Sequence, residues 1–92
     1  MKDDYSEDHH DVEYSLLSAA SKVFRVSVDK LSIESDPYSV KGWDSLAFLE
    51  FVMSLEKTFS IKLTAKDIMR ITSLKDALTV VREQIEPKRG VR

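Results

Sequence analysis

Cysteine is absent from the 92 residues of this chain, so disulfides and thiolate metal sites are excluded. Glycine and proline occur only twice each, which argues against a glycine-rich phosphate loop or a backbone anion nest. No apolar run approaches the length of a membrane-spanning helix, and the first residues show no signal-peptide pattern. We therefore expect a cytoplasmic protein without a membrane partner.

The chain also lacks a large excess of either charge, since its formal net charge is −2. Residues 1–13 hold six acids and one lysine, residues 14–86 hold ten acids and ten bases, and residues 87–92 hold three bases. The central part is therefore nearly neutral, and no basic face is large enough to predict a nucleic-acid partner. The length fits one domain with a modest core, and we expect a monomer.

Apolar residues recur at helical spacing over residues 12–25, 45–59 and 73–86, and a capping box at Thr64 opens a shorter helix that ends near residue 71. Asp36-Pro37 favours a turn, and residues 27–31 form at most a short helical turn. The sequence thus predicts an all-α fold, a four-helix bundle with three longer helices, a short third helix and a long loop between the first two.

The ends of the chain are predicted to lie outside this bundle. Residues 1–11 are polar, acidic and without periodicity, so we predict a disordered acidic tail. Pro87 is expected to end the last helix, which leaves residues 12–86 as the domain and residues 87–92 as a basic tail. The loop between the first two helices needs apolar anchors, and the candidates are Val26, Val28, Leu31, Ile33, Tyr38 and Val40. Trp43 is expected to pack under the end of the loop, and contact with a bound group or a partner is its alternative role.

The stretch Lys41-Gly42-Trp43-Asp44-Ser45-Leu46 carries the most specific signal in the chain. Asp44 is a good helix N-cap, because its carboxylate can accept backbone N–H groups of the first helical turn. Gly42 lets the preceding loop turn sharply. Ser45 then occupies the first helical position, where the helix dipole and free N–H groups would stabilise an attached anion.

The helix behind Ser45 is apolar on two neighbouring stripes. The core stripe is predicted to hold Phe48, Phe51, Val52, Leu55 and Phe59. The second stripe holds Leu46, Leu49 and Met53, with Ser45 and Glu56 along it; Ala47, Glu50, Ser54, Lys57 and Thr58 remain for the water side. The second stripe is either additional core on a helix covered from two sides or a surface that the core does not require.

Catalytic chemistry is poorly supported by these residues. The only histidines, His9 and His10, lie in the acidic tail, so Ser45 has no evident base for a serine–histidine–acid triad. Adjacent histidines point apart on a helix, and no metal site is predicted. We expect no catalytic residues and no enzymatic activity.

The motif Gly42-Trp43-Asp44-Ser45-Leu46 and its long helix resemble the attachment motif of acyl carrier proteins. Phe24-Arg25-Val26 is similar to the end of the first helix of that family, and residues 55–61 resemble the "LEEEFGI" close of its second helix. Residues 71–77 resemble the entry to its last helix, so the resemblance extends over about residues 12–85.

The resemblance implies a carrier rather than an enzyme. Ser45 would carry 4′-phosphopantetheine, which a phosphopantetheinyl transferase would add from coenzyme A with Mg²⁺, and the thiol of the arm would hold acyl groups as thioesters. Acyl-loading, condensing or acyltransferase enzymes would be the further partners. Their predicted contact surface comprises Leu46, Leu49, Glu50, Met53 and Glu56.

One departure from the family pattern bears on the pathway. Lys57 and Thr58 stand where acids often follow the leucine–glutamate pair of fatty acid synthesis carriers, and Lys62, Lys66 and Arg70 add positive charge. A specialised, polyketide-like pathway fits this pattern better than housekeeping fatty acid synthesis. An unmodified helical interaction module of the same fold is the alternative, and an esterase-like catalyst is the remote third class.

Overall fold

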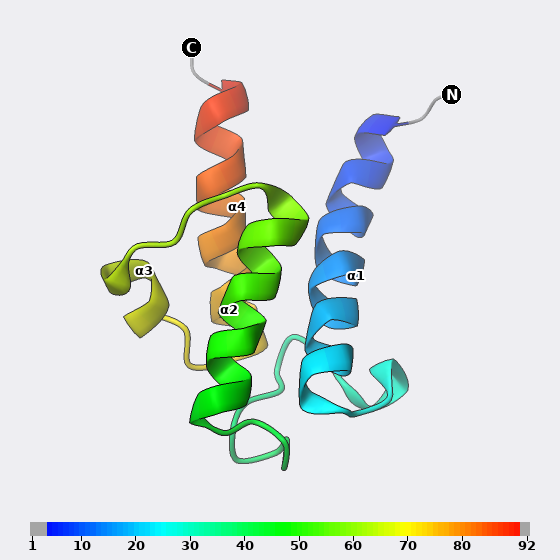
Figure 1. Cartoon of the computed structure of the whole chain (residues 1–92). Helices are drawn as coiled ribbons and strands as arrows, with labels where there is room; N and C mark the ends of the chain where they lie inside the picture. Colours follow the sequence, from blue (N-terminus) through cyan, green and yellow to red (C-terminus); the bar gives the residue numbers. More distant parts are fainter. Residues whose placement is uncertain (1–3, 91–92) are drawn as a thin grey trace.

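A computed structural model describes the backbone of residues 4–90 and the side chains of residues 12–85. Its elements are α1 (Asp4–Phe24), the single 3₁₀ turn η1 (Val28–Lys30), α2 (Ser45–Phe59), α3 (Ala65–Met69) and α4 (Leu74–Gly90). Residues 4–90 contain no strand (Figure 1). The predicted all-α fold is confirmed, with three longer helices, a short third helix and a long first loop.

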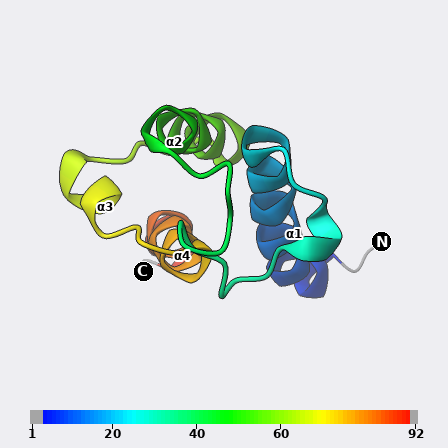
Figure 2. The ribbon, with the colours of Figure 1, turned by 90° about the horizontal axis from the view of Figure 1, so that it is seen from below.

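The three long helices pack together, and α3 stands beside α2 and α4 on the side away from α1 (Figure 2). Helix α1 begins and α4 ends at one end of the bundle, whereas α2 begins at the opposite end (Figure 1). The start of α2, whose first residue is Ser45, therefore lies far from both ends of the described chain.

The core draws apolar side chains from all three long helices. The fully enclosed ones are Leu16 and Ala20 of α1, Phe51 and Leu55 of α2, and Leu74, Ala77, Val80 and Val81 of α4. Ile61 and Leu63, from the segment between α2 and α3, are also buried. Burial of these side chains supplies most of the free energy that holds the helices together.

The helix boundaries differ from the predicted ones at both ends of the chain. Helix α1 begins at Asp4 and not at Val12. Helix α4 continues past Pro87 to Gly90, although a proline removes one helical hydrogen bond. Residues 1–3 and 91–92 lie outside the described residues, and the division of the chain into a domain and two tails stays a prediction.

Local capping signals are largely confirmed. Ser27 caps η1, and Thr64 and Asp67 form the complete capping box predicted for α3. At α4 the Ser73 hydroxyl accepts the Asp76 N–H at 3.2 Å, which is the first half of a capping box. The Asp76 carboxylate, however, accepts the N–H and the hydroxyl of Thr72, so the second half of this box is displaced by one residue.

Two helices end in a left-handed residue that is not glycine. Arg25 follows α1 with φ 60°, and Ser60 follows α2 with φ 56°. The next N–H groups return to the helices, since Val26 donates to the Ser21 carbonyl and Ile61 to the Glu56 carbonyl, both at 3.1 Å. This is the hydrogen bonding of a Schellman ending, in which glycine is the usual left-handed residue.

The long loop between α1 and α2 is held by buried residues and by side-chain turns. Leu31 and Val40 are buried, but Tyr38 is 99% exposed, so its prediction as an anchor is wrong. The Asp36 carboxylate accepts the N–H groups of Tyr38 and Ser39, both at 3.0 Å, and this turn directs Tyr38 outward. The Ser35 carbonyl accepts the Leu74 N–H at 2.9 Å, which ties the loop to the start of α4.

Candidate functional site

Asp44 caps α2 as the sequence predicts. Its backbone is extended, and its carboxylate accepts the Ala47 N–H at 2.9 Å. Ser45 is therefore the first helical residue, and its side chain is exposed. Within residues 12–85 the Ser45 hydroxyl has no hydrogen-bond partner, so it is free to react.

The backbone N–H groups of the first turn of α2 are only partly used. Ala47 donates to Asp44, and Phe48 donates to the Asp44 carbonyl at 2.8 Å. The N–H groups of Ser45 and Leu46 have no acceptor among the described residues. Such free N–H groups at the positive end of a helix suit an anion bonded to the Ser45 oxygen.

Gly42 is required for a different reason from the predicted one. Its φ is not positive, so the turn itself does not demand a glycine. A Cβ atom at this position would overlap the carbonyl oxygen of Phe24 and lie 3.1 Å from its carbonyl carbon. The loop crosses the last residue of α1 at a distance that only glycine allows, and this crossing fixes the start of α2 against α1.

An aromatic cluster surrounds this crossing. The Trp43 ring stacks on Phe24 with centroids 4.8 Å apart and an interplanar angle of 10°. The Phe48 ring is also nearly parallel to Trp43, at 6.2 Å, and Phe51 meets Phe24 at a tilt, at 5.4 Å. Trp43 thus packs at the end of the loop, as predicted, and its ring is held in a fixed orientation beside Ser45.

A hollow of about 300 Å³ opens at this point, lined by Pro37, Trp43, Asp44, Ser45 and Phe48. The predicted site accounts for only part of this lining. Pro37 comes from the loop turn, eight residues before Ser45, and Phe48 was predicted as core but is only half-buried. Neither residue is predicted from the sequence to belong to the site.

The second apolar stripe of α2 is a surface and not additional core. Leu46, Leu49 and Met53 are 68%, 53% and 66% exposed. Glu50 is exposed beside them. This resolves the choice left open by the sequence, and the three residues are called the outer strip below.

The opposite side of α2 is more enclosed than predicted. Phe51, Val52 and Leu55 are buried as expected, and Phe59 is half-buried. Ala47 was predicted to face water but is buried, at 9% exposure. It lies one turn before Phe51, whose ring contacts Phe24 of α1, so the same neighbouring helix covers both residues.

Glu56 has a structural role that the sequence did not indicate. Its side chain is half-buried, and one carboxylate oxygen accepts the Leu63 N–H at 2.9 Å. Glu56 therefore holds the segment that leads from α2 to α3. Its other carboxylate oxygen remains available for the orienting contact with partners that the sequence predicts.

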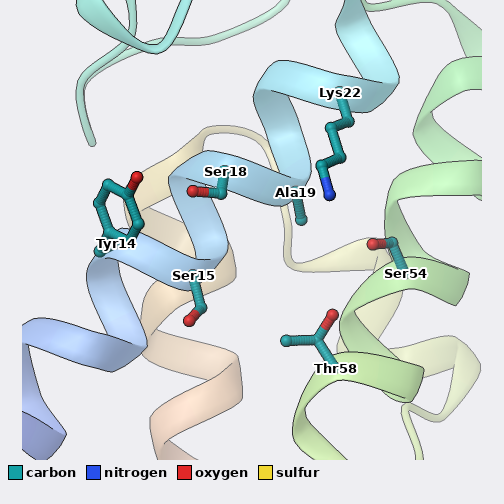
Figure 3. Close-up of a pocket in the computed structure, with 7 residues that line it drawn as sticks. All are labelled: Tyr14, Ser15, Ser18, Ala19, Lys22, Ser54 and Thr58. Atoms are coloured by element: carbon teal, nitrogen blue, oxygen red, sulfur yellow. The ribbon is translucent and has the colours of Figure 1, made fainter.

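A second hollow, also of about 300 Å³, lies between α1 and α2 (Figure 3). Its lining is mainly hydroxyl-bearing and comprises Tyr14, Ser15, Ser18, Ala19, Lys22, Ser54 and Thr58. No histidine or carboxylate is among these seven residues, and no hydrogen bond joins Lys22 to one of the serines of the lining.

Perturbed titratable groups gather where α3 meets α4. Arg70 binds Glu83 through two hydrogen bonds of 2.8 and 3.0 Å, and this pairing lowers the pKa of Glu83 and raises the pKa of Arg70. Hydrogen bonds from the Thr64 backbone lower the pKa of Asp67, and those from Thr72 lower the pKa of Asp76. These contacts stabilise the folded form and supply no reactive group.

The described residues contain neither a metal-binding cluster nor a membrane-spanning helix. No group of three or more histidine, cysteine or acidic residues there is placed to hold a metal ion. None of the helices in that part of the chain is long and apolar enough to cross a membrane.

Comparison with known proteins identifies the family. The family model described as "Phosphopantetheine attachment site" matches residues 15–81. A relative from Schizosaccharomyces pombe named "Putative acyl carrier protein, mitochondrial" is 32% identical over 85 residues, which cover 91% of this chain and 76% of the relative.

A solved structure agrees in fold. The solution structure of a holo acyl carrier protein from Geobacter metallireducens aligns with a TM-score of 0.76 at 21% sequence identity, covering 89% of this chain and 94% of the other. Proteins of this family are carriers and not catalysts, they act with biosynthetic enzymes, and their cofactor is covalently bound 4′-phosphopantetheine. With its matching helices and the Asp44-Ser45-Leu46 sequence at the exposed start of α2, this chain belongs to the acyl carrier protein family.

Proposed function

We propose that Ser45 is the residue to which the phosphopantetheine is attached. The observation that carries this proposal is the exposed Ser45 hydroxyl at the first position of α2, inside the region matched by the family model. Asp44 holds the helix start by binding the Ala47 N–H, so the hydroxyl stands on a rigid element. The N–H groups of Ser45 and Leu46 would stabilise the phosphate of the cofactor.

The residues around Ser45 fit such a group. The hydroxyl is accessible, the helix dipole favours an anion, and the aromatic hollow leaves space next to the oxygen. When bound, the group supplies a thiol that holds acyl units as thioesters. Since the protein has no cysteine, no other thiol of the chain competes for the acyl unit. The protein would then shuttle these units between enzymes that carry out the chemistry.

The outer strip is the proposed docking surface for the transferase and for the loading, condensing or acyltransferase enzymes. Leu46, Leu49 and Met53 supply apolar contact area, and Glu50 and Glu56 would orient the partner. Lys57, Lys62 and Lys66 are exposed, so positive charge interrupts the acidic run that follows the leucine–glutamate pair in fatty acid synthesis carriers. This pattern supports a specialised, polyketide-like pathway rather than housekeeping fatty acid synthesis.

The test is intact mass measurement after incubation with coenzyme A, Mg²⁺ and a broad-specificity phosphopantetheinyl transferase. The wild-type protein should gain one phosphopantetheine, and Ser45→Ala should gain none while keeping its helicity, because Asp44 remains as the cap. Ser54→Ala, a serine-to-alanine change on the same helix, should be modified like the wild type. Modification of Ser45→Ala at another serine would disprove the assignment.

A second candidate function is an unmodified interaction module of the same fold. The exposed outer strip favours it, because such a strip could bind partners without any attached group. A folded wild-type protein that gains no mass with several active transferases would support this alternative.

A further inference from the structure

The hollow beside Ser45 has an apolar wall built from two separate parts of the chain. Pro37 comes from the turn held by Asp36, and Trp43 and Phe48 flank the start of α2. Ser45 belongs to the same lining, so any group on its oxygen begins at the edge of this hollow. A concave apolar site buries more of a flexible ligand than a convex helix surface does.

Trp43 has the properties of a rigid contact surface for a ligand. Its ring is only half-buried, although stacking on Phe24 at 4.8 Å fixes its orientation. Within the described part of the chain its indole N–H has no acceptor. The ring therefore offers an apolar area and one unused hydrogen-bond donor, and it loses little conformational freedom when a ligand binds.

The outer strip is the competing surface for a group attached to Ser45. Its three side chains are 53–68% exposed and stand on one convex helix face. The hollow is lined from the loop and from α2 and contains the stacked Trp43 ring, whereas the strip is a single helix face with flexible side chains such as Met53. A phosphopantetheine arm carries methyl and methylene groups together with two amides, which match the apolar wall and the free indole N–H.

We infer that the inner part of the phosphopantetheine arm lies in the hollow over Trp43, with Pro37 and Phe48 as its other walls, and leaves the outer strip free for partners. The inference rests on the proposed attachment at Ser45. Trp43 is then a positioning residue for the arm, and the arm points toward the α1–α2 loop.

Fluorescence tests this directly, because Trp43 is the only tryptophan of the protein. The apo form and the arm-bearing form, with loading verified by intact mass, are compared for emission maximum and for quenching by acrylamide. Loading should move the emission to shorter wavelength and reduce quenching. In an NMR experiment with a ¹³C-labelled arm, its methyl protons should show nuclear Overhauser effects to the indole.

Two variants separate the hollow from the outer strip. Pro37→Ala removes part of one wall at an exposed loop position, and it should weaken the protection of Trp43 from acrylamide. Met53→Ala, on the exposed strip, should leave that protection unchanged. Circular dichroism checks that both variants fold.

The outcomes distinguish this inference from the proposed function. Full loading by mass with unchanged emission, quenching and indole Overhauser effects would overturn the inference and leave attachment at Ser45 intact. Loss of protection in Met53→Ala but not in Pro37→Ala would place the arm on the strip and also overturn it. A wild-type protein that gains no mass would overturn both.

Discussion

The two sides of α2 carry similar side chains but contribute to different properties of the molecule. On the inner side Phe51 and Leu55 are completely enclosed by the neighbouring helices. On the outer strip Leu46 and Met53 are 68% and 66% exposed, although they are as apolar as the residues they adjoin. Apolar composition therefore determines stability only where another element covers the side chain, and elsewhere it leaves a surface for binding.

Replacing Leu55 should give the largest effect, because it lies on the inner side. Leu55→Ala should lower the free energy of unfolding by about 2–5 kcal/mol, the usual loss for a buried leucine. Such a loss is a large part of the total stability of a small domain. Urea denaturation of this variant and of Leu46→Ala, the same change on the outer strip, measures the difference. Equal losses at both positions would show that the two sides are alike.

The packing of α2 against α1 also depends on the close approach of the Gly42 backbone to the Phe24 carbonyl. Gly42→Ala should lower the free energy of unfolding by about 1–3 kcal/mol, because the new methyl group would push the loop away from the Phe24 carbonyl. Urea denaturation measures this loss, and the Trp43 emission should change as its stacking on Phe24 is disturbed. An unchanged stability and emission would mean that the loop adjusts freely.

For the outer strip, the expected effect is on binding and not on folding. Met53→Ala should weaken binding to a cognate enzyme by about 1–2 kcal/mol, since each buried CH₂ contributes about 0.8 kcal/mol, while stability stays nearly constant. Glu50→Gln is the control for charge, and it should weaken binding less, because exposed ion pairs contribute only about 0–1 kcal/mol. Titration calorimetry at low and physiological salt measures both. Collapse of the affinity with salt, with Glu50→Gln the more damaging change, would show that the partner recognises charge.

The end of α2 allows a smaller, stabilising change. Ser60→Gly should raise the free energy of unfolding by up to about 1 kcal/mol, because glycine adopts φ 56° without the steric cost that serine has there. Thermal denaturation measures the gain, and Ser54→Gly within the same helix should instead be destabilising. A destabilised Ser60→Gly would show that the greater freedom of glycine in the unfolded chain outweighs the relief.

The smallest effect is expected at the exposed contact between α3 and α4. The pKa values of Asp67, Asp76 and Glu83 are lowered in the folded form, so their contribution is present above the ordinary carboxyl pKa, about 4, and is lost as the pH falls through the folded values. Glu83→Gln should therefore lower the melting temperature slightly at pH 7 and less at pH 3. Glu50→Gln, at an exposed carboxylate of α2, is the control. An equal effect of Glu83→Gln at both pH values would contradict this account.

Features set by neighbouring residues were predictable from the sequence. The caps at Asp44 and Thr64 depend on a side chain and an N–H group three residues away, and both form as predicted. The helical periodicity of the core stripes likewise gave the fold class. Ser45 at an exposed helix start follows from the same local signals.

Features set by distant elements were not predictable. Ala47 is buried because α1 covers it, and no local pattern shows which helix will lie there. The need for Gly42 arises from the Phe24 carbonyl, 18 positions earlier in the chain. The hollow likewise forms because the folded loop brings the turn at Pro37 next to Phe48. The position of this turn is a property of the folded loop and not of its local sequence.

The position of the chain ends has a consequence for how this protein can be tethered. Helix α1 begins and α4 ends at the end of the bundle opposite to the start of α2 (Figure 1). Helix α2 alone, with 15 residues at 1.5 Å per residue, spans about 22 Å of the distance between these two ends of the bundle. If a linker, a surface or a neighbouring domain were joined at either end, Ser45 would lie on the side of the bundle that faces away from the attachment point. The length of the linker would then set the distance that Ser45 can travel, and the attached partner would not cover the serine.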